Sequence, residues 1–533
     1  MLLGYHSNEI PALCSVECKD SVSVFNLKYN DSSFRGVEQV SLLCHTEGFA
    51  LPHVDTRHAR TLAAGVEGRM GKKLPPVKVV DFYSNLKQTT KTWIDRRKIE
   101  PLPKDYDFSF DTWLSKTHYP EWRKEQLRKI NAEIQYMFER NDRDELKHFR
   151  VKLFCKDEVY LDFKHARGIY AREDVAKVVF GPYFKAIEEV IYGEKEFIKH
   201  VPVQKRAEYI TEMLYTEGGK YVQTDYSSFE ALFNPTLMEN CEFVLYDHML
   251  KHIPEGNFML DILREVLQGT NVIENKHFHA LVVASRMSGE MNTSLGNGFS
   301  NLMLMFNLCE RLGLECRGVV EGDDGLFVFT GQTPTTEQFT EMGCSIKLEV
   351  FTELSKASFC GLLFDPEALQ IVTNPYEILA QFGWTTKDYA KASLNKLKML
   401  LRSKSLSYLY QYPGCPIVSE LAEFGLRVTR SFDIRKYAQN GKMCMWEREQ
   451  LLQALDNKHL CVKQEIHIGT RLLFEELYGI SVSEQLMIEK YLRNKNDLSP
   501  LQLPSLIDAV PSSWVRYYDN YSVNLKKNES AIS

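Results

Sequence analysis

Two adjacent carboxylates stand in the middle of the stretch RGVVEGDDGLFVFTG, which runs from Arg317 to Gly331. Asp323 and Asp324 lie with two glycines between apolar runs. This pattern is typical of a β-hairpin with a tight turn, because glycine permits a positive φ and aspartate tolerates it. Taken alone, a turn is the simpler explanation. The alternative is a metal site, since carboxylate oxygens are the ligands that Mg²⁺ prefers.

A third carboxylate, Asp225, ends the strand-like run KYVQTD far upstream in the chain. Phosphoryl transfer with two metal ions needs carboxylates that converge on one place, with the ions about 3.5–4 Å apart. An aspartate at a strand end, opposite a pair at a hairpin tip, supplies this arrangement with little loop freedom. The three aspartates together therefore predict a two-metal phosphoryl-transfer site.

Polar side chains also interrupt an apolar helical stretch, ASRMSGEMNTSLGNGFSNL. Ser288 and Gly289 open it, and Thr293 and Asn297 follow four residues apart, on one helical face. Hydroxyl and amide groups in this position could meet a nucleotide sugar. Alternatively, Thr293 and Asn297 are helix-interior polar residues that bond to the neighbouring backbone. The residues alone leave both interpretations open.

Basic residues flank these motifs on both sides. Arg167 and Arg172 lie in FKHARGIYAR, and arginine forks fit phosphate oxygens bidentately, although a solvated charged face is as good an explanation. Downstream, alternation in CSIKLEV places Lys347 on one face with Ser345 and Glu349. Lys347 could lie near a polyphosphate leaving group, but a surface lysine on a strand is the more common case.

The elements that must position these residues follow from hydrophobic periodicity. Helical spacing predicts one helix over residues 121–144 and another that ends at Gly313. Ser227 and Glu230 match the S-x-x-E capping box, which predicts that a helix follows the strand of Asp225. The order strand, helix, helix, hairpin, helix, strand predicts a small antiparallel sheet with helices on one face, an α+β fold. After about Pro375 the chain is predicted to be mainly helical.

Composition limits the class of protein. The 533 residues are 44% hydrophobic and 26% charged, which suits a large multi-lobed globular protein, and a net charge of −6 excludes a simple polycationic coat while allowing a local basic channel. Twelve scattered cysteines indicate reduced thiols in an intracellular compartment. No run reaches the ~18–20 apolar residues of a membrane span, and no signal peptide is expected. A zinc site could be assembled from Cys14, Cys18, Cys44, His45 and His53, but their spacings fit no strong zinc signature.

In their order, these segments resemble the motifs of an RNA-dependent RNA polymerase of a positive-strand RNA virus, and the motif B text is similar to tombusvirus-like polymerases in particular. QTDYSSFEALF resembles motif A, RMSGEMNTSLGNGFSNL motif B and VVEGDDGLFVF motif C. GCSIKLEV, SFCGLLF and FKHARGIYAR resemble motifs D, E and F, and SKTHYPEWRKEQLRK is a weaker match to motif G. The clear resemblance covers Tyr119 to Phe364.

The resemblance implies an α+β right-hand polymerase with fingers, a palm made of an antiparallel sheet backed by helices, and a mainly helical thumb. We expect residues 1–100 to form an N-terminal extension with fingers and fingertip contacts, and 101–215 to form fingers with motifs G and F. Residues 216–370 would be the palm, with a fingers insertion around 255–285. Residues 371–533 would form the thumb and C-terminal segment.

The resemblance also implies the reaction and its residues: in-line attack of a 3′-hydroxyl on an α-phosphate, directed by an RNA template. Mg²⁺, or Mn²⁺ as a substitute, would be bound by Asp225 and Asp323, with support from Asp324 and the Tyr226 carbonyl. Lys347 would be the general acid for pyrophosphate. The expected nucleotide-binding residues are Lys164, Arg167, Arg172, Glu230, Ser288, Gly289, Thr293 and Asn297. The expected RNA-binding residues are Tyr119, Arg123, Lys124, Phe359, Cys360 and Gly361.

One position departs from the family pattern. Motif A usually reads Asp, four residues, Asp, and here the second acid is Glu230. In the family this acid helps to recognise the ribose 2′-hydroxyl through the motif B asparagine, which is Asn297 here. Glutamate is one methylene longer, so the capping role and the sugar-reading role of Glu230 both stay open.

Two other functions share parts of this pattern. A reverse transcriptase shares the palm and the Asp-Asp hairpin, but Ser-Gly followed by Thr and Asn is the RNA-polymerase pattern. A non-catalytic RNA-binding replication scaffold is disfavoured because every metal-binding aspartate is present.

Two aromatic-rich segments, SLSYLYQYPGCP and SSWVRYYDNYS, could stack on an initiating nucleotide, although such residues more often belong to the core.

The partners implied are the RNA template, the nascent RNA and nucleoside triphosphates. Other viral replication proteins and, indirectly, host membranes are also implied, with no transmembrane segment of the chain's own. The expected location is the host cytoplasm, in membrane-associated replication complexes.

Overall fold

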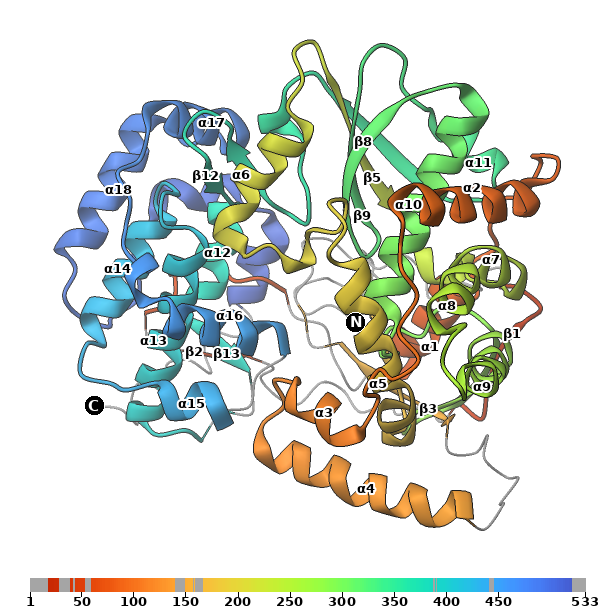
Figure 1. Ribbon diagram of the computed structural model, residues 1–533. Helices are drawn as coiled ribbons and strands as arrows, with labels where there is room; N and C mark the ends of the chain where they lie inside the picture. The colour runs from red at the N-terminus through yellow and green to blue at the C-terminus, as the bar shows by residue number, and fades with distance from the viewer. Residues whose placement is uncertain are drawn as a thin grey trace.

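The structure is a computed structural model, and it describes residues 18–27, 39–41, 44–52, 59–139, 149–156, 158, 166–386, 389, 391–440 and 445–519. Two sheets and a C-terminal group of helices organise the described chain (Figure 1). Within these residues no helix combines the length and the apolar composition needed to cross a bilayer.

A four-stranded antiparallel sheet carries the predicted hairpin. Its strand order is β10-β5-β9-β8. The bounds are β5 Lys220–Tyr226, β8 Cys316–Glu321, β9 Asp324–Phe329 and β10 Ile346–Phe351. The predicted small antiparallel sheet is therefore confirmed.

Helices cover both faces of this sheet, so the prediction of helices on one face is wrong. Helix α10 (Thr293–Leu312) shares a core with Phe327 of β9, whereas α6 (Val203–Leu214) shares another core with Leu326 and Val328. The physical reason is that β9 continues as GLFVF, which is apolar at consecutive positions and needs cover on both sides.

Helix α10 ends where the sequence predicts. Gly313 adopts a φ of 65°, a left-handed conformation that glycine accepts without strain, and its N–H closes the last turn. The other helices in this part of the molecule are α2 Phe82–Arg97, α7 Pro235–Asn240, α8 Glu242–Leu250, α9 Gly256–Gln268 and α11 Thr336–Glu341.

The segment after β5 differs from the prediction. It forms only a short 3₁₀-helix, η4 (Phe229–Leu232), preceded by Ser228 at a φ of 58°. The capping-box interpretation is therefore wrong, because no side-chain cap begins a helix there. The first α-helix starts later, where the Asn234 side chain accepts from the Leu237 N–H at 2.9 Å and proline occupies the first turn.

A five-stranded sheet joins segments that are far apart in sequence. Its order is β1-β7-β6-β3-β4, and β3 pairs with β6 in parallel while the other pairs are antiparallel. The bounds are β1 Val22–Phe25, β3 Val151–Cys155, β4 Gly168–Arg172, β6 Thr270–Glu274 and β7 His279–Val283. Helix α1 (Ala59–Gly65) and the π-helix η1 (Val66–Met70) pack against one face.

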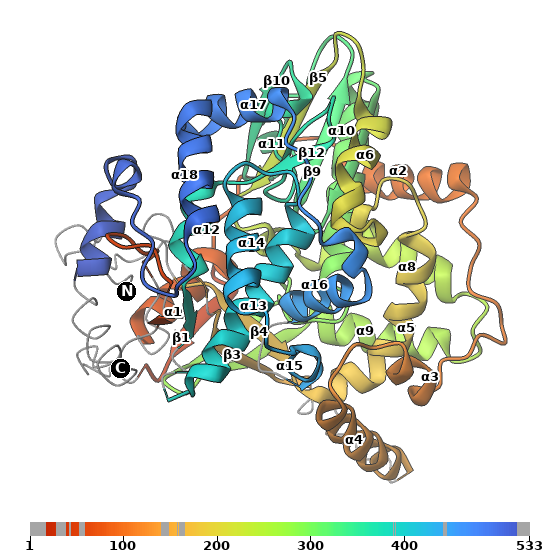
Figure 2. The ribbon, with the colours of Figure 1, turned by 90° about the vertical axis from the view of Figure 1, so that its left-hand side faces the viewer.

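Two further helices lie between β1 and β3 in sequence, and another follows β4. They are α3 Phe110–Ser115, α4 Glu121–Glu139 and α5 Asp174–Ile191. The helix predicted over residues 121–144 is confirmed as α4 as far as the description extends. Figures 1 and 2 show α4 at the bottom of the molecule and the four-stranded sheet at the top.

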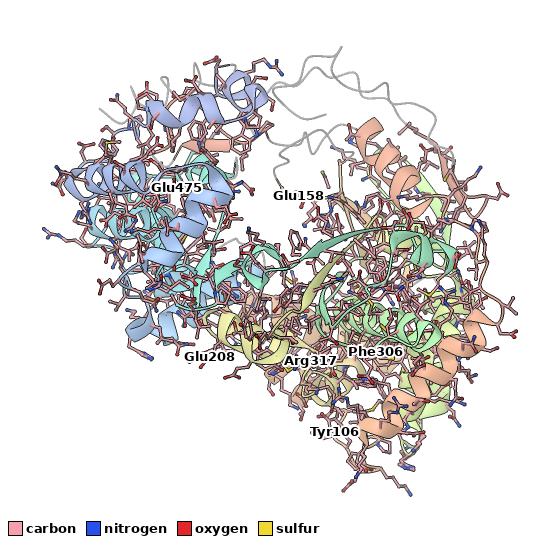
Figure 3. The ribbon with its side chains drawn as sticks, turned by 90° about the horizontal axis from the view of Figure 1, so that it is seen from above. Tyr106, Glu158, Glu208, Phe306, Arg317 and Glu475 are labelled. Carbon is pink, nitrogen blue, oxygen red and sulfur yellow. The ribbon has the colours of Figure 1, made fainter. Side chains whose placement is uncertain are left out.

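The C-terminal part is mainly helical, as predicted, and has its own core. Seen from above, Glu475 in this region lies at the upper left of the molecule and Arg317 of β8 near its lower centre, with Glu208 of α6 to the left of Arg317 (Figure 3). The helices are α12 Pro375–Phe382, α13 Leu394–Gln411, α14 Val418–Val428, α15 Arg435–Asn440, α16 Met445–Asp456, α17 Ile468–Tyr478 and α18 Val482–Asn494. Short strands pair as β11 Leu363–Asp365 with β12 Gln370–Val372, and β13 Trp384–Thr386 with β2 Gln39–Ser41.

The aromatic-rich segments of this region belong to its core. Tyr410, Trp514 and Tyr517 are each 2% exposed. Their rings are therefore packed against protein and are not free to stack on a nucleotide. Residues 520–522 of the second segment lie outside the described residues.

Candidate active site

The β8–β9 hairpin turns at Gly322 and Asp323. Gly322 has a φ of 62°, and Asp324 is already the first residue of β9, paired with Glu321. A positive φ at the first position of a two-residue turn explains the glycine. The predicted hairpin is confirmed, and its tip exposes the Asp323 side chain.

Asp225 lies beside this hairpin. Strand β5 pairs with β9 through Thr224 and Gly325, so Asp225 and Asp324 follow that pair on adjacent strands. Alternation places both side chains on the face that carries α6, and both remain exposed. The structure thus brings the three predicted aspartates to one edge of the sheet.

Electrostatic repulsion accumulates at this edge. Partial burial, followed by the charges of Asp323 and Asp225, raises the pKa of Asp324 to about 6. A divalent cation would relieve this repulsion, and an all-carboxylate donor set fits Mg²⁺ or Mn²⁺, which commonly combine one or two carboxylates with water and substrate phosphates. In the described ranges, no cluster of three or more His, Cys, Asp or Glu side chains is placed to hold a metal ion.

A buried asparagine supports the turn from behind. Asn301 on α10 is fully buried, and its Nδ2 donates to the Asp323 carbonyl at 3.0 Å and, more weakly, to the Gly322 carbonyl at 3.4 Å. Sequence reasoning missed this residue. Its signal was available, because Asn301 follows Asn297 by one helical turn on an otherwise apolar helix.

Lys347 lies directly opposite Asp225 in the β10–β5 register. Its ammonium group is exposed and pairs with Glu349 at 2.7 Å, which raises the pKa of Lys347 and confirms that the two side chains share a face. The structure thus places a protonated amine next to the aspartates, and its role as a general acid stays a prediction.

The loop before α10 is fixed to the five-stranded sheet. Ser288 Oγ donates to the Gly168 carbonyl at 3.3 Å and accepts from the Tyr170 N–H at 3.2 Å. A Cβ on Gly289 would lie 2.7 Å from both the Tyr170 oxygen and the Ala171 Cα. Glycine is therefore required here for close approach, and Ser288 has a structural role whatever its role toward a nucleotide.

Thr293 and Asn297 have different partners. Thr293 Oγ1 donates to the Met287 carbonyl at 2.9 Å, which is the backbone-bonding alternative. Asn297 Oδ1 instead accepts from a side chain, Arg286 Nε, at 3.1 Å.

The basic residues of FKHARGIYAR separate into two environments. Arg167 is exposed, with its Nε 3.6 Å from Glu158. Arg172 is only 5% exposed, and its guanidinium donates to Glu290, Asn271 and two backbone carbonyls. The prediction that Arg172 grips a triphosphate is therefore wrong, because its donors are used inside the protein. Lys164 lies outside the described residues.

The residues predicted to bind RNA are also partly occupied. Arg123 forms a forked pair with Asp174 at 2.5 and 2.7 Å, and Tyr119 packs in a core cluster, while Lys124 is half-buried. Phe359 is 2% exposed, so its ring cannot contact an RNA strand as predicted.

Cys360 and Gly361 form a two-residue turn, with φ values of 52° and 74°, between Phe359 and Leu362. This turn places the Cys360 thiol near Glu321 and Asp324, so it is close to the aspartates. Burial, followed by these two carboxylates, raises the pKa of the Cys360 thiol.

Cationic side chains from the N-terminal part reach the segment after β5. Arg69 forms a forked pair with Glu230, with distances of 2.6 and 3.2 Å. Lys72 Nζ donates to Ser227 Oγ at 2.7 Å and to Ser345 Oγ at 3.1 Å. Sequence reasoning missed both, because no local pattern connects residues so far apart. Glu230 is thus an ion-pair partner and not a helix cap.

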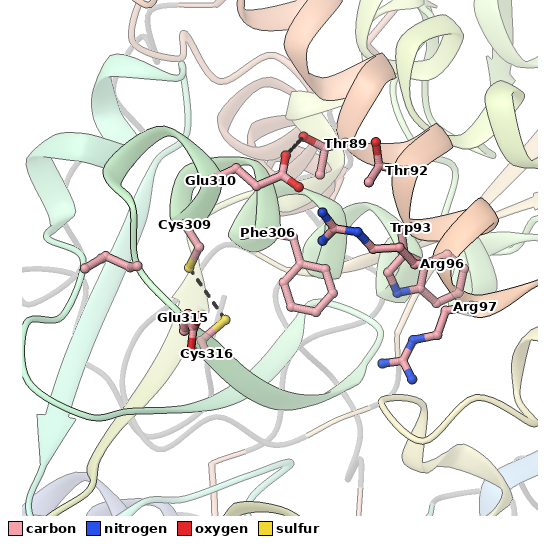
Figure 4. Close-up of a pocket in the computed structure, with 11 residues that line it drawn as sticks. Thr89, Thr92, Trp93, Arg96, Arg97, Phe306, Cys309, Glu310, Glu315 and Cys316 are labelled. Carbon is pink, nitrogen blue, oxygen red and sulfur yellow. Dashed lines mark hydrogen bonds between the residues drawn. The ribbon is translucent and has the colours of Figure 1, made fainter.

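A cavity of about 520 Å³ lies away from the three aspartates. Helix α2, the end of α10 and the start of β8 line it, with Trp93, Arg96 and Phe306 among its residues (Figure 4). No predicted site residue belongs to it. The zinc hypothesis also fails to assemble, since Cys18 and Cys44 belong to separate cores, while Cys14 and His53 lie outside the described residues.

Comparison with known proteins finds sequence similarity to viral polymerases. Residues 242–497 match the family described as viral RNA dependent RNA polymerase. The RNA-directed RNA polymerase of Striped jack nervous necrosis virus is 26% identical over 184 residues, 33% of this chain and 18% of that protein. Those of Pothos latent virus and Panicum mosaic virus are 27% and 29% identical over 211 and 174 residues. These matches cover 36% and 30% of this chain, and 28% and 17% of the relatives.

The chain thus spans less than a third of the length of each relative. The matched range contains α10, the β8–β9 hairpin and most of the C-terminal helices. Residues 242–497 of the chain are thus similar in sequence to viral RNA-dependent RNA polymerases, in agreement with the motif residues.

Proposed function

We propose that the chain catalyses template-directed RNA synthesis by two-metal nucleotidyl transfer and replicates a positive-strand viral RNA genome. The observation that carries this proposal is the meeting of Asp225 with Asp323 and Asp324 at one edge of the sheet. The sequence match to polymerases supplies the reaction class, and the geometry supplies a place for it.

In this mechanism, Asp225, Asp323 and Asp324 would hold Mg²⁺, with the Tyr226 carbonyl as a further ligand. When bound, the metal ions neutralise phosphate charge and favour in-line attack by a 3′-hydroxyl. Lys347, opposite Asp225, holds a proton that can pass to the pyrophosphate leaving group. Arg167 remains exposed for phosphate contact.

The architecture fits a right hand. The four-stranded sheet would be the palm, and the five-stranded sheet with α3–α5 the fingers. The C-terminal helices would be the thumb. RNA and nucleoside triphosphates are the partners this function requires, and other viral replication proteins and membrane-associated complexes in the host cytoplasm belong to the proposal.

Primer extension with purified protein tests this function. Wild type should extend an RNA primer on an RNA template with Mg²⁺ or Mn²⁺, and Asp323→Ala should not. Running ribonucleotides and deoxyribonucleotides on one template separates an RNA polymerase from a reverse transcriptase. Mg²⁺ should raise the melting temperature of wild type, and Asp225→Asn should remove that shift. Substantial Mg²⁺-dependent extension by Asp323→Ala would contradict the assignment.

A further inference from the structure

Two thiols meet where helix α10 ends and strand β8 begins. The Cys309 thiol donates to the Cys316 sulfur at an Sγ–Sγ distance of 3.5 Å, and both side chains lie in the wall of the cavity between α2, α10 and β8 (Figure 4). The contact follows from the chain reversal at Gly313. Its left-handed backbone lets the Leu314 N–H donate to the Cys309 carbonyl at 2.9 Å, and β8 then packs against α10. The backbone itself therefore holds the two cysteines side by side.

The cavity gives small molecules a route to this pair. Cys309 is 4% exposed, whereas Cys316 is half-buried, and both line the same cavity of about 520 Å³. The exposed side chains of Arg96, Glu310 and Glu315 also line it, so the cavity opens to solvent. Ligand pockets of about 300–1,000 Å³ hold drug-sized molecules. A hydroperoxide or a small thiol reductant can therefore reach the two sulfurs.

The pair has the chemistry of a reversible two-electron couple. The Cys316 sulfur attacks one oxygen of a hydroperoxide, the O–O bond breaks, and the thiol proton leaves with the other oxygen as an alcohol (water, in the case of hydrogen peroxide). The Cys309 sulfur then attacks the resulting sulfenic acid, an S–S bond forms and water leaves. Two thiols and one hydroperoxide thus give one disulfide, one alcohol and one water. A thiol reductant returns both cysteines to thiols by exchange.

The resting state of the pair is the dithiol. The hydrogen bond from Cys309, followed by burial, raises the pKa of the Cys316 thiol. Because the thiolate is the nucleophile, this slows attack on a hydroperoxide at neutral pH. Oxidation therefore requires an excess of the oxidant.

A bond at this place would join the two elements that hold the turn at Gly322 and Asp323. Helix α10 carries Asn301, which donates to the Asp323 carbonyl at 3.0 Å and lies about two helical turns before Cys309. Strand β8 begins at Cys316 and leads directly into Gly322. A disulfide bond measures about 2.05 Å, so the sulfurs, now 3.5 Å apart, must approach by about 1.5 Å. Close-packed interiors transmit such a displacement, so part of it reaches the turn.

We propose that Cys309 and Cys316 are a modification site: a hydroperoxide oxidises them to a reversible disulfide, which displaces the turn at Gly322 and Asp323 and slows RNA synthesis. The effect on RNA synthesis rests on the proposed function, whereas formation of the bond does not. The two parts are therefore measured separately, on the same samples of the full chain.

Peptide mass spectrometry detects the bond. The protein is reduced, treated with an excess of hydrogen peroxide, alkylated in urea and digested with trypsin. Trypsin cleaves after Arg311, between the two cysteines, so a disulfide joins two peptides that otherwise separate. We expect the linked species in wild type and its loss after dithiothreitol. Peptides that stay unlinked after peroxide, whether alkylated or oxidised further, would overturn the inference.

Primer extension measures the effect on the turn. We expect kcat to fall by about tenfold on oxidation and to recover with dithiothreitol, since a misplacement of about 1 Å can cost about a hundredfold. Cys316→Ser should keep the wild-type kcat before and after peroxide. Cys461→Ser is the matched control, because it removes another half-buried thiol, which donates to the Ala454 carbonyl at 3.4 Å. It should respond to peroxide as wild type does.

The outcomes separate the two proposals. A linked pair with unchanged kcat, or an equal loss of kcat in Cys316→Ser, would overturn the control of the turn by this pair. Absence of RNA synthesis by the reduced wild type would instead overturn the proposed function. The linked peptides would still decide whether the dithiol is oxidised.

Discussion

Replacing Asn301 by aspartate tests how the turn at Gly322 and Asp323 is held. The change exchanges an NH₂ group for an oxygen without changing the volume of the side chain. It removes the donor that reaches the Asp323 carbonyl at 3.0 Å and the Gly322 carbonyl at 3.4 Å. Because Asn301 is fully buried, water cannot replace the lost donor on the helix side.

The loss in the free energy of unfolding of Asn301→Asp depends on pH. Near pH 4 the introduced carboxyl is neutral, and its O–H can still donate one hydrogen bond. The free energy of unfolding should therefore fall by only about 1 kcal/mol, the contribution of one lost hydrogen bond. Burial, with Asp323 nearby, keeps this carboxyl neutral in the folded state, while it ionises in the unfolded state above about pH 4. Folding then takes up a proton, so the free energy of unfolding falls with rising pH by about 1.4 kcal/mol per unit. Between pH 5 and pH 7 the free energy of unfolding should therefore fall by about 2–3 kcal/mol more in the variant than in wild type.

Urea denaturation of Asn301→Asp and wild type at pH 5, 6 and 7 measures this loss. Asn307→Asp is the control, because Asn307 is 5% exposed on the same helix and donates to Thr89 at 3.1 Å, away from the turn. Both variants should lose stability with pH, but only Asn301→Asp should lower kcat for primer extension under conditions where both are folded. A stability difference from wild type that does not change with pH, or an unchanged kcat in the folded variant, would refute the reasoning.

Three further predictions follow from single side chains. Asp323→Ala removes an exposed group, so the melting temperature should stay near that of wild type while Mg²⁺-dependent primer extension is lost. Gly289→Ala would push a methyl group against the Tyr170 oxygen at 2.7 Å, and urea denaturation should show a loss of about 1–3 kcal/mol. Trp514→Ala should lower the free energy of unfolding by about 3–5 kcal/mol, because the ring is 2% exposed and its removal leaves a cavity. Assayed side by side, de novo initiation and primed extension should then fall together, and a selective loss of initiation would show that the ring contacts a nucleotide.

The sequence predicted those parts of the site that local patterns determine. The hairpin followed from Gly322 and its flanking apolar runs, and the end of α10 followed from Gly313. Asp225 was found because a strand end is visible in alternation. Each of these features depends on neighbours within a few residues, and short-range sequence contains that information.

Burial of charged residues could not be predicted in the same way. Arg167 and Arg172 look alike in sequence, yet one is exposed and the other is enclosed by Glu290 and Asn271. The partners of Arg172 come from distant segments, so only the fold decides which of the two arginines is buried. Phe359 shows the same limit, because its motif position suggested RNA contact while its ring fills a core.

Glu230 shows how a departure from the motif pattern can have a structural reason. An aspartate at this position would withdraw the carboxylate by one C–C bond, about 1.5 Å, from Arg69, which it now meets at 2.6 Å. The extra methylene of Glu230 therefore allows its carboxylate to reach Arg69. The sequence does not show this pairing, because Arg69 lies in the N-terminal helix η1 and Glu230 in the turn after β5. The alternative of a helix cap disappears because Ser228 begins only a short 3₁₀-helix. What remains is a carboxylate that pairs with Arg69 in a turn where a helix cap is not needed.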